Sequence, residues 1–255
     1  MLAGKIRALR RKKKLLLMPH MVLGFPSYAE NKKLVGAMVE AGAEIIEMQI
    51  PFSEPMSDGP VILKANDEAL KRGATTEKCL TFAREVCAQY PDTIFIFMTY
   101  YNIPFVYGLK AFAEKARKAG VLGLIVPDLP PEEAKDYLAA CKKADIDPIF
   151  IFTPTNTDKR LTYLSRFSKG MVYCVGRKGV TGLKTKIDKS LAALVKKYKR
   201  ATKLPLALGF GIQSKEDIAA LPKDVDIAVL GTKILTLHQE KGIAGVGRFL
   251  KTARG

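Results

Sequence analysis

The sequence predicts a single (β/α)8 barrel over residues 1–255, with a short basic helix at its N-terminal end. Eight strand-like segments alternate with helix-like segments, and no break in composition separates them. The strand-like segments are continuous apolar runs, as expected of parallel strands that are covered on both faces. Segments rich in polar residues, glycine and proline follow the strands, where barrel enzymes build their active sites. A doubly wound open sheet is the alternative, but no Gly-x-Gly-x-x-Gly pattern follows the first strand.

Each expected strand is a short apolar run, and the helices that follow show apolar residues at helical spacing. Glycine and proline mark helix ends, as Gly42 does after one helix and Pro131 does at the start of another. The expected strands cover residues 15–23, 44–49, 93–98, 121–126, 148–152, 171–175, 204–208 and 226–230. The expected helices cover residues 28–41, 61–72, 76–89, 110–119, 158–168, 187–199, 215–221 and 242–252, with another opening at residue 131.

The charge balance is strongly basic, with 42 lysines and arginines against 25 acidic residues and a net charge of +17. Such an excess favours anionic partners. The basic residues are spread along the helices except at residues 5–14, and no aromatic-interleaved basic patch or zinc-finger spacing is present, so we expect no nucleic-acid binding. Pro19 and His20 break the apolar run after this basic stretch, which favours a first helix and strand over a signal peptide.

The composition also bounds the compartment and the cofactors. No run approaches the ~20 apolar residues that a membrane span needs. The four cysteines form no Cys-x-x-Cys pair and are expected to be reduced core thiols. Two histidines in all exclude a histidine-rich metal site. We therefore expect a cytoplasmic protein without a membrane partner and without a bound metal.

Two carboxylates stand near each other in sequence but in different settings. Glu47 closes the apolar run of the second strand, whereas Asp58 lies in a loop that Pro51, Pro55 and Pro60 keep from being helical. A carboxylate at the end of a core strand is unfavourable unless it is paired or protonated. One strand-borne and one loop-borne acid suit two carboxyl groups with different roles in one site. The structural alternatives are that Glu47 pairs with a core lysine or arginine and that Asp58 caps a helix.

Glycine turns follow the last three expected strands, at residues 179–182, 209–211 and 231–232. Glycine lets backbone N–H groups approach an anion closely, and a helix N-terminus adds partial positive charge. In barrels, the loops after the seventh and eighth strands are the usual phosphate site. The sequence therefore predicts a phosphate site here, with Thr232 at the start of a short helix.

Several aromatic and apolar side chains are candidates for a pocket at the same end of the barrel. We expect Tyr173 to point into the barrel with its hydroxyl group near Glu47. Tyr100, at the end of the third strand, is expected either to wall a pocket or simply to pack. A flat apolar pocket is expected to be lined by Phe25, Phe210 and Ile212.

Five segments in this order resemble the α subunit of tryptophan synthase, and the resemblance runs from about residue 24 to residue 235. The segments are Pro-Phe-Ser at 51–53 with Asp-Gly-Pro at 58–60, Met-Thr-Tyr-Tyr-Asn at 98–102, Pro-Asp-Leu-Pro at 127–130, Gly-Val-Thr-Gly at 179–182 and Gly-Phe-Gly-Ile at 209–212. The resemblance implies a (β/α)8-barrel lyase of tryptophan biosynthesis. Its reaction would be the retro-aldol cleavage of indole-3-glycerol phosphate to indole and glyceraldehyde 3-phosphate.

The resemblance also implies roles for individual residues. Glu47 would be the acid and later the base, Asp58 would accept the indole N–H and stabilise the positive charge on the ring, and Tyr173 would lie beside the glutamate. The phosphate would be bound at Gly182, Gly211, Gly231 and Thr232. The indole ring would be surrounded by Phe25, Tyr100, Ile125, Phe210 and Ile212. The loop of residues 176–186 would be a lid that includes Arg177 and Thr181, with Thr181 contacting Asp58.

The resemblance further implies a partner, a β subunit that carries pyridoxal phosphate and receives the indole in an α2β2 heterotetramer, while this chain itself would hold no cofactor. The sequence departs from the family pattern at Met48 and Gln49, where Leu-Gly is usual, and at Glu54, where aspartate is usual. Gly176 and Thr232 each stand where serine is usual. Because the loop around Glu54 would meet the β subunit, a free-standing indole producer is an alternative. An inactive scaffold that only activates a β subunit is another, against which intact Glu47 and Asp58 argue.

Overall fold

The computed structural model describes residues 2–176, 189–209 and 211–254. The strands are β1 (Leu16–Val22), β2 (Ile45–Gln49), β3 (Ile94–Met98), β4 (Gly123–Ile125), β5 (Asp147–Ile149), β6 (Ile151–Phe152), β7 (Val172–Val175), β8 (Leu206–Gly209) and β9 (Ile227–Leu230). The helices are α1 (Leu2–Lys12), α2 (Tyr28–Glu40), α3 (Pro60–Lys71), α4 (Thr76–Gln89), α5 (Asn102–Tyr107), α6 (Leu109–Lys118), α7 (Lys135–Ala144), α8 (Asp158–Phe167), α9 (Lys189–Ala201), α10 (Lys215–Ala219) and α11 (Thr232–Arg254).

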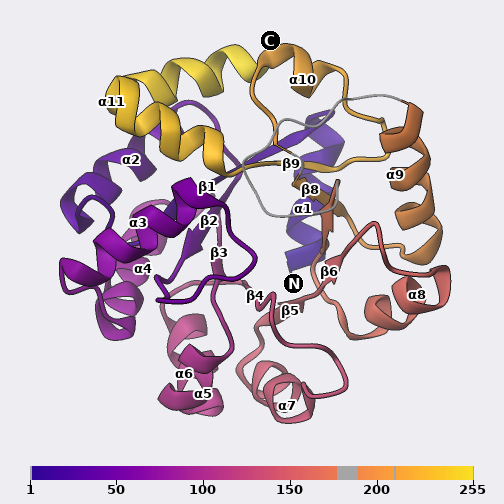
Figure 1. Cartoon of the computed structure of the whole chain (residues 1–255), viewed down its shortest axis with the longest axis horizontal. Coiled ribbons are helices and arrows are strands. Elements are labelled where there is room, and N and C mark those ends of the chain that lie inside the picture. The colour runs from indigo at the N-terminus through magenta and orange to yellow at the C-terminus, as the bar shows by residue number, and fades with distance from the viewer. Residues whose placement is uncertain (1, 177–188, 210, 255) are drawn as a thin grey trace.

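The strands form one closed parallel ring, and helices surround it (Figure 1). The strand order is β5-β4-β3-β2-β1-β9-β8-β7-β6. The first and last strands of this order, β5 and β6, are consecutive in the chain and are separated only by Phe150, so the ring closes. The Phe150 N–H group donates to the hydroxyl of Ser168 at 3.1 Å instead of to a strand, which divides the fifth strand into β5 and β6. The (β/α)8 barrel predicted from the sequence is therefore confirmed.

Side-chain alternation along the strands separates two apolar layers. One cluster lies between the strands and the surrounding helices and includes Ile46 and Met48. A second cluster fills the barrel interior and includes Met18 and Ile45 together with Leu2 of α1. Odd-numbered residues of β2 and even-numbered residues of β1 therefore point inward.

Helix α1 lies against the N-terminal ends of the strands, because its apolar residues belong to the interior cluster. The N–H group of Leu2 donates to Asp147 at 3.2 Å, at the start of β5. Just after the helix, Lys13 pairs with Glu44 at 2.6 Å, next to the start of β2. The expected basic N-terminal helix is thus present, and it covers the end of the barrel away from the carboxyl ends of the strands.

The structure corrects three details of the expected elements. The helix expected to open at Pro131 begins at Lys135, because residues 130–134 form turns in which Ala134 donates to the Pro131 carbonyl at 3.2 Å. Helix α5 was not expected, since Pro104 lies inside it. Helix α11 bends at Gly242, which has φ 61° and ψ −171°, so that the expected segment 242–252 forms its second half.

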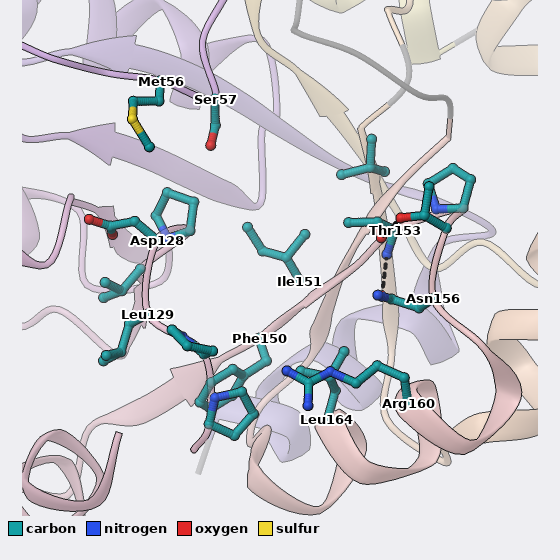
Figure 2. Close-up of a pocket in the computed structure, with 17 residues that line it drawn as sticks. Met56, Ser57, Asp128, Leu129, Phe150, Ile151, Thr153, Asn156, Arg160 and Leu164 are labelled. Carbon is teal, nitrogen blue, oxygen red and sulfur yellow. Dashed lines mark hydrogen bonds between the residues drawn. The ribbon is translucent and has the colours of Figure 1, made fainter. Parts of the chain in front are cut away.

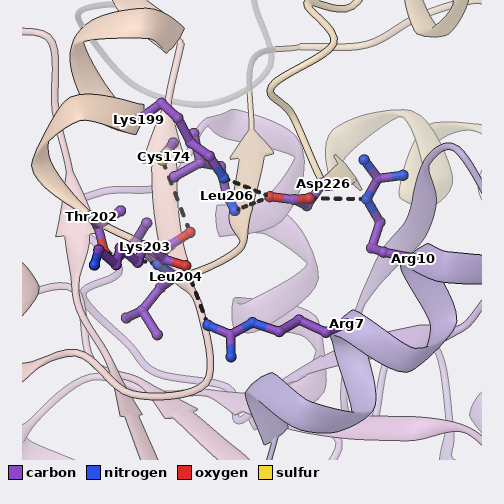
Figure 3. Close-up of polar contacts among 10 residues, drawn as sticks. Arg7, Arg10, Cys174, Lys199, Thr202, Lys203, Leu204, Leu206 and Asp226 are labelled. Atoms are coloured by element: carbon purple, nitrogen blue, oxygen red, sulfur yellow. Dashed lines mark hydrogen bonds and ion pairs between the residues drawn. The ribbon is translucent and has the colours of Figure 1, made fainter.

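Asp226 ties α1 to the strands around the bottom of the barrel (Figure 3). Its carboxylate accepts from the N–H group of Leu206 at 2.9 Å and pairs with Arg10 at 3.0 Å and Lys199 at 3.6 Å. Beside it, Arg7 donates to the carbonyl of Lys203 at 3.4 Å. One carboxylate therefore satisfies a strand amide and holds two cations from different helices.

We expect Asp226→Ala to lower the free energy of unfolding by about 1–3 kcal/mol, since it leaves the Leu206 amide without its acceptor. Urea denaturation followed by circular dichroism measures this change. The matched control is Asp224→Ala, an exposed acid two residues away, which should stay within about 0.5 kcal/mol of the parent. Equal stability of the two variants would contradict this role of Asp226.

Candidate active site

Glu47 is the central residue of β2 and points into the barrel, like the other odd-numbered residues of this strand. Its side chain is 1% exposed, and its Oε2 atom lies 3.1 Å from Nδ1 of His20 on the neighbouring strand β1. The two residues are register partners across the parallel ladder, which fixes their separation. Within the described residues the charged partner of Glu47 is therefore a histidine and not the lysine or arginine of the alternative expectation. The other oxygen, Oε1, accepts no hydrogen bond from any of these residues.

His20 is a residue of this site that the sequence interpretation did not assign. Burial alone opposes its charged form, but Glu47 and, more weakly, Asp58 and Gln49 outweigh burial and raise its pKa above the ordinary 6.5. Its Nε2 atom forms no hydrogen bond within the part of the chain that the structure describes. Alternate side chains of a strand point to the same face, and His20 is two residues after Met18 and four after Leu16, which both point inward. This alternation in the sequence could have identified His20.

Asp58 lies in the loop between β2 and α3 and faces the same end of the barrel. Its Oδ2 atom accepts from Nε2 of Gln49 at 2.8 Å and from the hydroxyl of Tyr100 at 3.2 Å. The N-cap of α3 is Gly59, so the alternative that Asp58 caps this helix is wrong. Burial raises the pKa of Asp58, although the hydrogen bonds from Gln49 and Tyr100 and the charge of His20 oppose the rise.

Tyr100 orders the loop that carries Asp58. Its hydroxyl accepts from the N–H group of Ser57 at 3.1 Å while it donates to Asp58. Its ring stacks on Phe52, with centroids 5.2 Å apart and planes 19° apart. Asn66 of α3 accepts from the N–H group of Phe52 at 2.9 Å and holds the start of the loop. The loop acid is therefore fixed from three sides.

Tyr173 is the inward-facing tyrosine of β7 and packs against the interior cluster. Its hydroxyl lies next to Gly209, where a Cβ atom would approach it to 2.8 Å, so only glycine fits at that position. Burial raises the pKa of Tyr173, and the charges of Glu47 and Asp58 add to the rise. The influence of both carboxylates on the Tyr173 pKa agrees with the expectation that the Tyr173 hydroxyl lies near Glu47.

The candidate phosphate residues lie after the last two strands. Gly211 follows β8 with φ 80°, a conformation that favours glycine. Gly231 follows β9, and no atom of a described residue lies within 4 Å of the place its Cβ would occupy. Thr232 is the first residue of α11, the helix whose N-terminal amides face this end of the barrel. Gly182, Arg177, Thr181 and Phe210 lie outside the described residues.

The residues expected around an indole ring are only partly gathered here. Tyr100 contacts Asp58, and Ile125 at the end of β4 belongs to the barrel interior. Phe25 packs instead in a cluster with residues of α3 and with Leu235 of α11. Ile212 packs in the layer between strands and helices. Tyr100 and Ile125 are thus the described candidates that accompany the acids.

A cavity of about 590 Å³ opens beside the site (Figure 2). The Asp58 loop contributes Met56 and Ser57 to it, and the loop after β4 contributes Asp128 and Leu129. Both Asp128 oxygens accept from the N–H group of Tyr101, at 2.9 and 3.0 Å, which holds these loops together. The cavity therefore leads from the edge of the acid-bearing loop toward α8. Within the described residues, no cluster of three or more histidine, cysteine or acidic side chains could hold a metal.

A closed parallel barrel with two carboxyl groups held at the carboxyl ends of its strands defines a (β/α)8-barrel enzyme. The sequence profile of the tryptophan synthase alpha chain matches residues 6–247. The chain is 47% identical over 252 residues to the tryptophan synthase alpha chain of Desulforapulum autotrophicum, covering 99% of both chains. It is 48% identical over 254 residues to that of Syntrophotalea carbinolica, covering 100% of both. The chain belongs to the tryptophan synthase alpha chain family.

A solved structure of Mycobacterium tuberculosis tryptophan synthase contains a chain that superposes with a TM-score of 0.92 at 30% identity, over 99% of this chain and 96% of that one. The resemblance inferred from five short segments is thus confirmed over the whole length. The chain is a lyase subunit of tryptophan biosynthesis, and the reaction of this subunit is the cleavage of indole-3-glycerol phosphate.

Proposed function

We propose that the mouth of this barrel carries out the retro-aldol cleavage of indole-3-glycerol phosphate, with Glu47 and Asp58 as its reacting groups. The observation that carries this proposal is the convergence of the two acids, one buried on β2 and one fixed in the following loop. A single electrostatic environment links them, since both influence the pKa of His20 and of Tyr173. Each acid then has one part of the reaction.

Glu47 acts on carbon and oxygen in turn. It delivers a proton to C3 of the indole ring, which leaves a positive charge shared with the ring nitrogen. The hydroxyl group on the adjacent side-chain carbon then loses its proton to Glu47, an aldehyde forms there, and the carbon–carbon bond electrons return to the ring. Indole and glyceraldehyde 3-phosphate leave, and Glu47 has given one proton and taken one back.

Asp58 stabilises the charged intermediate. Its carboxylate accepts the N–H group of the indole ring, so the positive charge that develops there is met by a fixed negative charge. Gln49 and Tyr100 hold this carboxylate in place before the substrate arrives. Tyr173 lies beside Glu47 and orients the reacting groups, while Tyr100 and Ile125 form a wall of the ring pocket.

The phosphate of the substrate binds at the glycine turns. Gly211, Gly231 and Thr232 offer backbone N–H groups and the N-terminus of the 23-residue helix α11, which favours an anion. The resemblance to the family further implies that Gly182 takes part in this phosphate site and that Arg177 and Thr181 belong to a lid over it. The net charge of +17 favours the capture of such an anionic substrate.

The partner that fits this chain is a tryptophan synthase β subunit, in an α2β2 assembly whose β subunits hold pyridoxal phosphate. Large apolar side chains are exposed near the mouth of the barrel, with Met56 79%, Phe105 61% and Val106 75% accessible. Met56 also lines the 590 Å³ cavity beside the site. Exposed apolar residues at the rim of a site are typical of a protein interface. The protein itself would be cytoplasmic, because its four cysteines are free thiols and form no disulfide. No described helix is long and apolar enough to cross a membrane.

Indole release from indole-3-glycerol phosphate tests the function, measured for the purified chain alone and with a tryptophan synthase β subunit. We expect release by the chain alone and a faster rate with the β subunit. A rate that the β subunit does not change would favour a free-standing indole producer. No release under either condition would refute the proposed activity.

A further inference from the structure

The Glu47–His20 pair is isolated from water more completely than an ordinary acid–base pair. The Glu47 and His20 side chains are 1% and 4% exposed and lie 3.1 Å apart. Burying such a pair is not a means of gaining stability, since apolar residues of similar volume often do as well or better. A buried pair at the catalytic end of a barrel therefore suggests a role in the reaction.

The groups that face His20 are almost all acidic or neutral. Strand β2 contributes Glu47 and Gln49, and the following loop contributes Asp58. On its other side, β1 is paired with β9, which places the apolar Val229 and Leu230 opposite Met18 and Pro19. Tyr173 of β7 faces the same two acids. Two carboxylates thus raise the pKa of the His20 ring, and no cation from the described part of the chain is among the groups that shift it.

Three buried polar atoms in this group form no hydrogen bond with any described residue: Nε2 of His20, Oε1 of Glu47 and Oε1 of Gln49. Gln49 also donates to Asp58 at 2.8 Å, and its side chain is among the groups that raise the pKa of His20. Hydrogen bonds thus join His20 to Glu47 and Gln49 to Asp58. No hydrogen bond to a described residue has to break before Oε1 of Glu47 contacts a substrate.

We propose that His20 stores the proton that Glu47 transfers, so that the two side chains act as one acid–base pair. This inference rests on the proposed function. His20 is a positioning residue in this scheme, because it acts only through Glu47. In this reaction one carboxyl group must first donate a proton and then accept one at neutral pH. A neighbouring histidine that holds the proton allows Glu47 to do both.

The protons balance over one turnover. At the start the imidazole is doubly protonated and Glu47 is ionised. The Nδ1 proton passes to the Glu47 carboxylate and from there to C3 of the indole ring. When the side-chain hydroxyl breaks its O–H bond, that proton passes to Glu47 and back to His20. The pair ends as it began, and no other reactant is required.

Histidine titration by NMR tests the pair without any assay of activity. The chain has only two histidines, so two imidazole titrations are expected, and His238→Gln assigns them. His20 should titrate above 6.5 in the parent chain, and His238 below 6.5, because burial lowers its pKa. In Glu47→Gln, the His20 pKa should fall, because burial then acts without the carboxylate. A His20 pKa below 6.5 in the parent, or one unchanged in Glu47→Gln, would overturn the inference.

The pH dependence of kcat tests the role in turnover. In the parent, kcat should fall as the pH rises through the raised His20 pKa, because the stored proton is lost. In His20→Gln, kcat should drop by up to about 100-fold with a smaller change in KM, and its alkaline limb should move to lower pH. His238→Gln, the matched control, should keep the parent profile, because this buried histidine faces Glu30 at 3.9 Å outside the site.

The possible results distinguish a failure of the His20 inference from a failure of the proposed function. A parent chain that releases no indole refutes the function, whereas the NMR titrations still decide whether the pair exists. A His20→Gln variant that keeps the parent alkaline limb overturns the inference and leaves the function standing. Should that variant fail to fold by circular dichroism, the titrations of the parent and of Glu47→Gln decide the matter.

Discussion

Glu47→Gln is expected to lower kcat for indole release by about 10²- to 10⁴-fold, the range that a general acid–base group contributes. Glutamine has nearly the same shape and can still hydrogen-bond with His20 at the same place, so the fold should persist. It cannot carry a proton to carbon or remove one from a hydroxyl. KM should change little, because the phosphate turns and the ring pocket are left intact. Steady-state indole release gives both constants.

The matched control is Glu44→Gln, three residues earlier in the chain. Glu44 is also buried, at 5% exposure, but it precedes β2 at the opposite end of the barrel. It pairs with Lys13 at 2.6 Å and accepts from the N–H group of Leu17 at 2.9 Å. Its substitution should lower stability and leave kcat unchanged. If Glu47→Gln kept more than about a tenth of the parent kcat, Glu47 would not be the general acid and base of the reaction.

The positions of the two acids were predictable because barrel geometry follows from the chain order. Parallel strands present their carboxyl ends at one rim, so a residue that ends a strand and a residue in the following loop must lie near each other. Asp58 lies in such a loop, Glu47 lies two residues before the end of β2, and Tyr100 follows the end of β3 by two residues. The sequence pattern alone was sufficient for this part of the site.

The partner of Glu47 was not predictable in the same way. His20 lies inside an apolar run, and although alternation along β1 gives the face of its side chain, its pairing with Glu47 depends on the register between β1 and β2. Gln49 was recognised as a departure from the family, but its hydrogen bond to Asp58 depends on how the loop folds back. The spacing of residues in the sequence does not predict hydrogen bonds between a loop and a strand.

The apolar candidates show the same limit. Phe25 and Ile212 follow strands, as residues of a pocket should. Phe25 packs in an apolar cluster with residues of α3 and with Leu235, and Ile212 packs in the layer between strands and helices. A loop residue can turn toward the barrel axis or toward the helices, and the packing of neighbouring helices decides which. Ile125 lies inside a strand, where alternation fixes its direction, and it faces the interior.

Asp58→Asn is expected to lower kcat by about 10²- to 10³-fold, similar to the loss of one preorganised group that stabilises charge in a transition state. Asparagine keeps an oxygen that can accept from Gln49 or Tyr100, so the loop should remain ordered. The neutral amide cannot offset the positive charge that develops on the indole ring. Asp67→Asn on α3, where the exposed Asp67 pairs with Lys71 at 2.7 Å, is the matched control and should leave kcat unchanged.

The pH profile distinguishes this role from a structural one. Asp58 must be ionised to act, and burial raises its pKa above the ordinary 3.8. The parent kcat should therefore fall on the acid side as the pH decreases through that raised pKa. Asparagine has no such ionisation, so the acid limb assigned to Asp58 should be absent from the residual activity of Asp58→Asn. An acid limb that stays at the same pH in the variant would show that another group controls it, and Asp58 would then only position its neighbours.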